Sequence, residues 1–243
     1  MRCKISPSNP PILCKLPTKI QRLTRPNAII TFSSSSFSKD NQRPISDTQT
    51  QLLKSELYSV KFKTLKACKL GIAQYPDFEY NAEGGTGTGS GTNVTESSLN
   101  NEILVSFDLK TVYIPPLTSA TTKFLGLPLP PFLKIDIVPE LFQGRISKES
   151  GKVDLEFKAK FWFSVGSVYK ALPLLVETVL TSEESIGTKR SGRGERLDEQ
   201  GKCRLVGVAT VDPIDDFLMN SFLGLPTECL ADLNAAISFY NSP

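Results

Sequence analysis

The sequence predicts a mainly β, or α+β, protein in which about seven to nine antiparallel strands form a barrel or a strongly curved sheet, followed by a C-terminal helical hairpin. Three observations predict this fold class. Apolar and polar side chains alternate at period two through much of residues 51–243, turn residues separate the alternating runs, and helical spacing begins only after residue 212. A sheet with one apolar face must cover that face by closing on itself or by packing on a second layer.

The clearest alternating run covers residues 153–164. Its apolar positions all point one way, and they are Val153, Leu155, Phe157, Ala159, Phe161 and Phe163. Charged or polar residues and Trp162 occupy the positions between them. This pattern is typical of a half-buried antiparallel strand, and the turn Lys148–Gly151 predicts a partner strand over 135–147.

Similar runs predict the remaining strands of a single domain over residues 51–243. They cover residues 57–63, 66–80, 103–114, 174–182, 188–197 and 203–211. Because short turns join the later runs, we expect neighbours in sequence to pair in space.

A segment rich in Gly, Thr and Ser, residues 83–101, is predicted to be a flexible loop between two strands. Its glycines do not match a nucleotide-binding pattern, since no register gives G-x-G-x-x-G and no G-K-[ST] follows.

Helical spacing predicts two helices, near 213–223 and near 226–239. Asp212 is the expected N-cap of the first helix, and Gly224 is expected to end it. The second is predicted from the spacing of Leu230, Leu233, Ile237 and Tyr240. Because the acidic residues after position 211 fit a helix start, no metal site is predicted there.

Residues 1–50 have the composition of a transit peptide. Every charge before Asp40 is positive, and the segment is rich in Ser and Thr. Prolines at positions 7, 10, 11 and 17 oppose the amphipathic helix of a mitochondrial presequence. The sequence therefore favours a chloroplast location, in the stroma or associated with the thylakoid, over a mitochondrial one.

The rest of the chain excludes several classes of function. Residues 1–50 hold eight of the 28 basic and two of the 25 acidic residues, so residues 51–243 carry 20 basic and 23 acidic ones, a net charge of −3. This balance argues against nucleic acid as a partner. The chain has no histidine, which excludes His-based triads and His metal sites. We therefore assign no catalytic residue, no metal and no cofactor.

The first candidate binding element is the apolar, proline-rich stretch 124–133. Its pentapeptide Phe124-Leu-Gly-Leu-Pro128 recurs as Phe222-Leu-Gly-Leu-Pro226. The two copies either pack into the core or form an apolar lip that holds a ligand or contacts a membrane. The candidate ligand-binding residues are Phe124, Leu127, Phe132, Leu133, Phe222 and Leu225.

The second candidate element is a basic hairpin. Arg190 and Arg196 would flank two glycines on one side of a strand, with Arg193 on the other. Such a strand can hold a planar anionic head group, or it can be an ordinary charged strand edge.

In architecture the expected fold resembles lipocalin-type and helix-grip ligand-binding barrels, although the only tryptophan, Trp162, lies mid-chain rather than in an early G-x-W. The sequence favours a plastid-targeted, non-enzymatic protein that binds a lipid, pigment or other hydrophobic ligand, or contacts a membrane surface peripherally. One alternative is a protein-interaction or assembly factor in the plastid. Another is a His-independent cyclase or isomerase in which Tyr169, Glu177 and Arg193 converge in one cavity.

Overall fold

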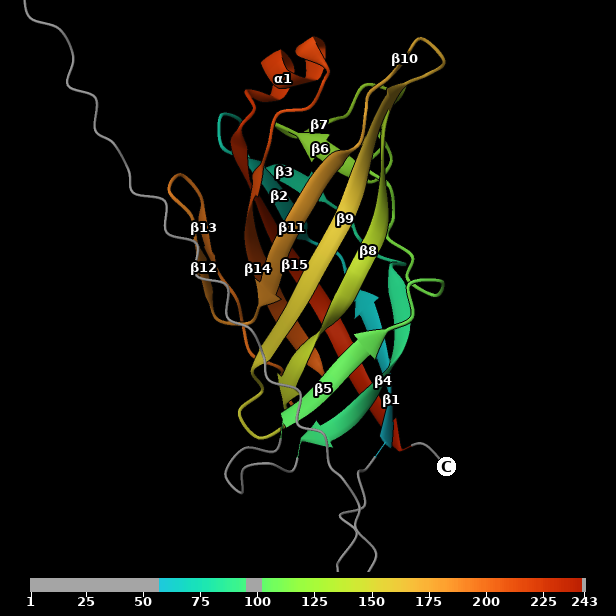
Figure 1. Ribbon diagram of the computed structural model, residues 1–243, viewed down its shortest axis with the longest axis vertical. Coiled ribbons are helices and arrows are strands. Elements are labelled where there is room, and N and C mark those ends of the chain that lie inside the picture. Colours follow the sequence, from blue (N-terminus) through green and yellow to red (C-terminus); the bar gives the residue numbers. More distant parts are fainter. Residues whose placement is uncertain (1–56, 95–101, 242–243) are drawn as a thin grey trace, which may run out of the picture. The chain divides into compact units, whose positions relative to one another are not determined.

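The computed structural model describes residues 57–94 and 102–241, and it is mainly β (Figure 1). The predicted leader, residues 1–50, and the last part of the predicted loop, residues 95–101, lie outside the described residues.

Eight antiparallel strands form a ring in the order β1-β4-β5-β8-β9-β11-β14-β15, and β15 pairs with β1 to close it. The ring strands are β1 (Leu57–Thr64), β4 (Thr86–Val94), β5 (Glu102–Phe107), β8 (Leu133–Ser147), β9 (Val153–Val165), β11 (Leu174–Thr181), β14 (Lys202–Val211) and β15 (Thr227–Asn241).

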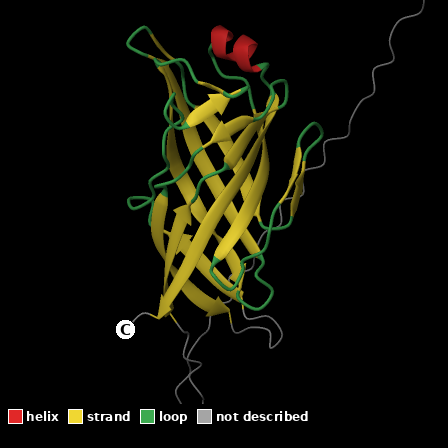
Figure 2. Ribbon diagram, turned by 180° about the vertical axis from the view of Figure 1, so that it is seen from behind, coloured by secondary structure: helices red, strands yellow, loops and turns green. Residues whose placement is uncertain are grey.

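The remaining elements are short. Four of them extend the sheet from β15: β2 (Cys68–Ile72), β3 (Phe78–Tyr80), β6 (Thr122–Phe124) and β7 (Leu127–Pro128). Strand β10 (Tyr169–Lys170) pairs with β9. A separate hairpin consists of β12 (Glu184–Ile186) and β13 (Ser191–Arg193). Helix α1 (Phe217–Leu223) lies at one end of the ring, which we call the helix end (Figure 2). Among the described residues, no helix combines the length and the apolar character needed to cross a bilayer.

The ring is not a regular barrel. Along one edge of β15, residues 229–232 pair with β2 and residues 235–241 pair with β1. The ladder between β11 and β14 is short, with Thr181 opposite Val206. Beyond this pair, the backbone of Val208 is hydrogen-bonded by side chains. Its carbonyl accepts a hydrogen bond from the Thr178 hydroxyl at 2.9 Å, and its N–H donates to the Ser185 hydroxyl at 3.0 Å.

Side chains fill the half of the ring away from α1. Val60, Ile103, Ile146, Val153, Leu155, Leu205 and Ile237 are almost completely buried there. Phe62, Phe107, Phe142 and Phe157 form an aromatic cluster with ring centroids 4.4–5.9 Å apart. We call this part of the interior the filled half.

The predicted strand over 153–164 is confirmed as β9, which pairs with β8 on one side and β11 on the other. The predicted alternation also holds, because Val153, Leu155, Ala159 and Phe163 are buried. The predicted strand over 188–197 is wrong in its extent: residues 191–193 form a strand in the separate β12–β13 hairpin, and Glu195 forms an isolated bridge with Arg204.

The predicted flexible loop over 83–101 is wrong for residues 86–94, which form β4. Glycine alternates with Thr or Ser here, and the glycines approach the backbone and side chains of β1 and β5 closely. A Cβ on Gly89 would lie 2.2 Å from the Ser106 carbonyl oxygen, and one on Gly91 would lie 2.7 Å from Ile103. The glycines therefore allow close packing of the filled half and do not mark a flexible linker.

The predicted second helix, 226–239, is also wrong, and with it the helical hairpin. These residues form β15, which pairs with β14 over Lys202–Val211 and with β1 over Tyr58–Thr64. Two flanking strands offer unpaired backbone groups, and this pairing overrides a local sequence that suits a helix.

One helix is present near the first predicted position. Gly224 ends it with φ 66°, as expected, but its N-cap is Asp216 and not Asp212. The Asp216 carboxylate accepts the Met219 N–H at 3.0 Å.

Candidate functional site

The half of the ring nearest α1 contains a cavity of about 500 Å³. Phe157 belongs both to the cavity wall and to the aromatic cluster of the filled half, so this cluster forms the floor. The wall includes Leu70, Phe78, Leu117, Ile135, Phe161, Phe163, Leu174, Val176, Leu180, Ala209, Val211 and Leu233.

The cavity exists because one side of the ring carries small residues. On β14 and β15, the positions that line it include Gly207, Ala209 and Ala231. On β9, which β11 separates from β14 in the ring, the lining positions are large, with Phe157, Phe161 and Phe163. Alanines among the lining residues leave space that the phenylalanines do not fill, and a cavity with an apolar lining favours an apolar occupant.

No charged side chain lines the cavity among the described residues. Its polar groups are the hydroxyls of Tyr75, Thr178 and Thr227 and the thiol of Cys229. The Tyr75 hydroxyl donates to the Phe222 carbonyl, and the Thr178 hydroxyl donates to the Val208 carbonyl. Burial raises the pKa of the Cys229 thiol to about 11, so the thiol is neutral at physiological pH.

The two copies of the repeated pentapeptide meet at the mouth of this cavity. The ring of Tyr75 lies between them, with centroids 6.3 Å from Phe124 and 5.9 Å from Phe222. Phe124 also stacks on Phe78 at 4.7 Å. The copies adopt different structures, since the first contains the β6–β7 turn, in which Leu125 and Gly126 have φ 51° and 78°, and the second contains the end of α1.

Most of the predicted apolar residues come together at this site. Phe124, Leu127, Leu133, Phe222 and Leu225 line the cavity. Phe132 is not part of the lining and is 71% exposed just outside it.

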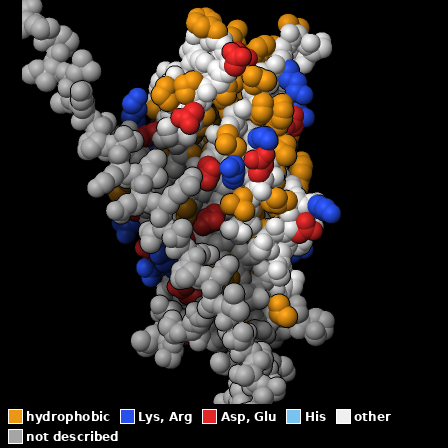
Figure 3. Space-filling model, viewed as in Figure 1, with side chains coloured by type: hydrophobic (Ala, Val, Ile, Leu, Met, Phe, Trp, Pro, Cys, Tyr) orange, Lys and Arg blue, Asp and Glu red, His pale blue; other side chains and the backbone are white. Residues whose placement is uncertain are grey.

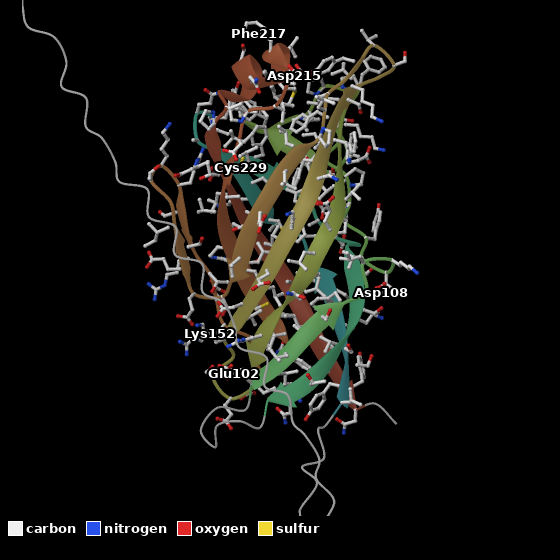
Figure 4. All side chains as sticks on the ribbon, in the orientation of Figure 1. Glu102, Asp108, Lys152, Asp215, Phe217 and Cys229 are labelled. Carbon is white, nitrogen blue, oxygen red and sulfur yellow. The ribbon has the colours of Figure 1, made fainter. Side chains whose placement is uncertain are left out.

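Exposed apolar side chains surround the mouth, and we call them the rim. They are Leu125, Leu127, Phe132, Val168, Phe217 and Phe222. Figure 3 shows hydrophobic side chains at the helix end of the drawn face. In Figure 4 Phe217 lies at this end, and Cys229 lies further along the ring on β15.

The three predicted arginines do not line the cavity. Arg190 instead fixes the β2–β3 turn through hydrogen bonds. Its guanidinium donates to the Asp77 carboxylate at 2.6 Å, to the Ile72 carbonyl at 2.6 Å and to the Tyr75 carbonyl. Arg196 pairs with Glu183 at 2.6 Å, and Arg193 is exposed on β13. None of the three arginine side chains therefore enters the cavity, although Arg190 holds two residues of its lining, Ile72 and Tyr75.

Sequence reasoning missed Glu228, which anchors the β12–β13 hairpin to β15. Its carboxylate accepts the N–H groups of Thr188, Lys189 and Arg190 at 2.7–2.9 Å and the Thr188 hydroxyl at 2.6 Å. These hydrogen bonds lower the pKa of Glu228 to about 2, with the Thr188 hydroxyl contributing most. The only signal in the sequence was the position of this acidic residue at the start of an otherwise mainly apolar segment, which forms β15.

Glu228 and Arg190 together position one side of the mouth. Glu228 holds the hairpin tip, Arg190 at that tip holds the β2–β3 turn, and Gln74 and Tyr75 of that turn bond to the Phe222 carbonyl. This chain of hydrogen bonds connects a side hairpin of the ring to the end of α1.

The residues of the predicted enzyme alternative do not converge. Tyr169 donates to Asp216 at 2.6 Å, Glu177 pairs with Lys158 at 3.4 Å on the outer surface, and Arg193 lies on β13. None of the three lines the cavity. Within residues 57–94 and 102–241, no group of acidic and cysteine side chains is arranged to hold a metal ion.

Comparison of the chain with protein-family models, with curated proteins and with solved structures gave no significant match. The ring and its lining residues define the site as an apolar cavity in an antiparallel β ring.

Proposed function

We propose that this protein binds an uncharged apolar small molecule, such as a lipid or a pigment, inside the ring and catalyses no reaction on it. The observation that carries the proposal is the cavity of about 500 Å³ with its almost wholly apolar lining. Small-molecule sites commonly have volumes of roughly 300–1,000 Å³ and mainly hydrophobic walls.

The lining also favours one class of ligand. A buried carboxylate or ammonium group needs a partner of opposite charge, and the described lining offers none. Hydroxyls at Tyr75, Thr178 and Thr227 suit at most a neutral polar group. We therefore expect neutral isoprenoid-like or acyl compounds to bind better than free fatty acids.

Titration with the neutral dye Nile red tests the proposal. The fluorescence of the dye should increase when it binds to the wild-type protein. Ala231→Phe should lower the affinity for the dye by at least about tenfold, because the added side chain removes cavity volume. A loss of about 1.4 kcal/mol of binding free energy corresponds to this factor of ten. The variant should remain folded, since an added apolar side chain fills space.

Ser238→Phe is the matched control, because Ser238 is exposed on the same strand. It should bind the dye like the wild type. Equal dye affinity of Ala231→Phe and the wild type would contradict the proposal, as would a wild-type protein that does not bind the dye.

The thiol of Cys229 gives a second readout of where the ligand lies. Cys68 and Cys203 are buried in the two halves of the core, whereas Cys229 lines the cavity. Bound dye should slow alkylation of Cys229, measured by peptide mass spectrometry, and should leave the alkylation of Cys68 and Cys203 unchanged.

A second candidate function is docking of a partner protein, as expected of an assembly factor, and the exposed rim favours it. Purification from plastid extract separates the two functions, since a stoichiometric protein partner supports docking and a co-purifying apolar compound supports binding in the cavity. The plastid location itself rests on the composition of residues 1–50, and a fluorescent fusion of the full chain tests it.

A further inference from the structure

We infer that the rim docks the protein onto a lipid bilayer with uncharged head groups, so that the mouth of the cavity faces the membrane. This inference concerns the rim as a docking surface and a bilayer as its partner. It rests on the proposed function only in the choice of lipid as the partner. Three observations on the described residues support it.

The first observation is that the apolar side chains of the rim lie on separate turns and element ends, which we call the tips. Leu125 lies in the β6–β7 turn, Phe132 precedes β8, Val168 lies in the β9–β10 turn and Phe217 begins α1. They are 70%, 71%, 91% and 87% exposed. Separate tips around an opening suit insertion into a fluid interface, where no complementary protein groove is needed.

The tips share one end of the ring. The Phe132 carbonyl accepts the Gly166 N–H at 2.9 Å, which holds the segment before β8 beside the β9–β10 turn. Tyr169 of β10 donates to Asp216, the residue before Phe217. Leu125 lines the cavity mouth together with Phe222 of α1. The rim and the cavity are therefore continuous, and an apolar molecule could pass between membrane and cavity without entering water.

The second observation is the conformation of Leu125. Leu125 and Gly126 both have positive φ in a two-residue hairpin loop, the pattern of a type I′ turn. Asn-Gly is the favoured sequence for this turn, and leucine is strained there. Exposure of an apolar side chain at a strained position does not stabilise the fold, which points to a role in binding.

The third observation is the charge around the mouth. Its basic residues include Lys123, Lys134, Lys170 and Arg190, and its acidic residues include Asp77, Asp136, Asp212, Asp215 and Asp216. Lys134 pairs with Asp136 at 2.8 Å, and Lys170 lies 5.1 Å from the ring of Trp162. Exposed Asp215 stands beside Phe217 at the helix end (Figure 4). The rim therefore lacks the excess positive charge that binds anionic lipid.

Trp162 and Lys170 also fit this orientation. Trp162 lies about 10 Å along β9 from Val165, at about 3.3 Å per residue. Tryptophan and lysine side chains are favoured at the boundary between head groups and water. With the tips inserted, this pair would lie at that boundary.

The test measures co-flotation of the full-length protein with phosphatidylcholine vesicles. Leu125→Asn should reduce vesicle binding by about tenfold or more, because a leucine side chain no longer enters the bilayer. The same substitution should raise the melting temperature by about 2–4 °C, because asparagine suits the turn. Weaker binding by a more stable variant cannot result from unfolding.

Phe217→Glu is the second variant. An acidic residue in the first turn of α1 favours the helix, so this variant should fold and bind vesicles weakly. Leu104→Asn is the matched control: Leu104 is exposed on β5, away from the rim, and the substitution should leave vesicle binding unchanged.

Three results would overturn the inference: a wild-type protein that does not float with the vesicles, rim variants that bind like the wild type, or binding only when phosphatidylserine is added. A protein partner that is captured by the wild type and lost with Leu125→Asn, without vesicle binding, would assign the rim to protein docking instead.

Failure of docking is distinguishable from failure of the proposed function. Ala231→Phe should retain vesicle binding and lose Nile red, whereas Phe217→Glu, at a rim residue outside the cavity lining, should lose vesicle binding and still load Nile red in vesicle-free buffer. Each variant thus tests one of the two statements.

Discussion

Glu228 shows at the scale of a single residue how a distant contact stabilises the site. Its carboxylate binds the tip of the β12–β13 hairpin, whose Arg190 then holds the turn beside the mouth. A buried charge is tolerated here because four donors satisfy it. These partners are 38–40 positions away in the sequence, so local pattern could not predict them.

Glu228→Gln should destabilise the protein at neutral pH, because its NH₂ group places a donor against backbone donors. The pKa of Glu228 is lowered in the folded state, from 4.5 to about 2. The stability that the charge contributes is therefore fully present above about pH 4.5 and is lost as the pH falls through 2.

The measurement is urea unfolding of both proteins between pH 7 and pH 2. The difference in the free energy of unfolding should shrink below about pH 4.5. Glu177→Gln, at an exposed ion pair, is the control and should change stability by about 0–1 kcal/mol throughout. A difference for Glu228→Gln that stays constant down to pH 2 would contradict this account.

At the scale of elements, β4 and β15 mark where sequence reasoning failed. Period two was visible in the alternation of Gly with Thr and Ser over residues 85–92, but glycine carries no side chain from which to read an apolar face. The spacing of Leu230, Leu233 and Ile237 fits a helix locally, and only pairing with β1 and β14 makes it a strand. By contrast β9, with its large alternating side chains, was predictable.

Gly89→Ala should reduce the free energy of unfolding by roughly 1–3 kcal/mol, because its Cβ would lie 2.2 Å from the Ser106 carbonyl oxygen and 2.8 Å from the Phe107 Cα. Gly87→Ala should cost less, since its nearest neighbour is a Val112 methyl group at 3.2 Å. Chemical denaturation of the two variants provides the comparison. A larger loss for Gly87→Ala would show that β4 does not pack as described.

At the scale of the whole molecule, the interior divides into a filled half and a cavity half. The sequence predicted that the strands close around an apolar interior, and it predicted an apolar element made of two repeated segments. It did not predict that one half of the interior would contain a cavity. The cavity depends on which small and which large side chains line the same half of the ring, and this follows from strand register. It pairs Gly207 with Ala231 on neighbouring strands, and both residues line the cavity together with Phe161.

This division predicts unequal protection from hydrogen exchange. Backbone amides of β1, β5 and the adjoining part of β8 should exchange at least about tenfold more slowly than those of β2, β3 and β6, because fewer packed contacts hold the second group. Nile red should slow the second group and leave the first unchanged. Uniform exchange across the ring would contradict the division.

The place of β15 in the ring has a consequence for how the chain is made. It is the last ring strand in chain order, and it alone joins β14 to β1 and β2. Until residues 227–241 leave the ribosome, β1 and β14 both have unpaired edges, and the ring cannot form. Synthesis therefore exposes an open sheet with an apolar face until residues 227–241 have emerged, and a chaperone that shields sheet edges would be needed most before that point.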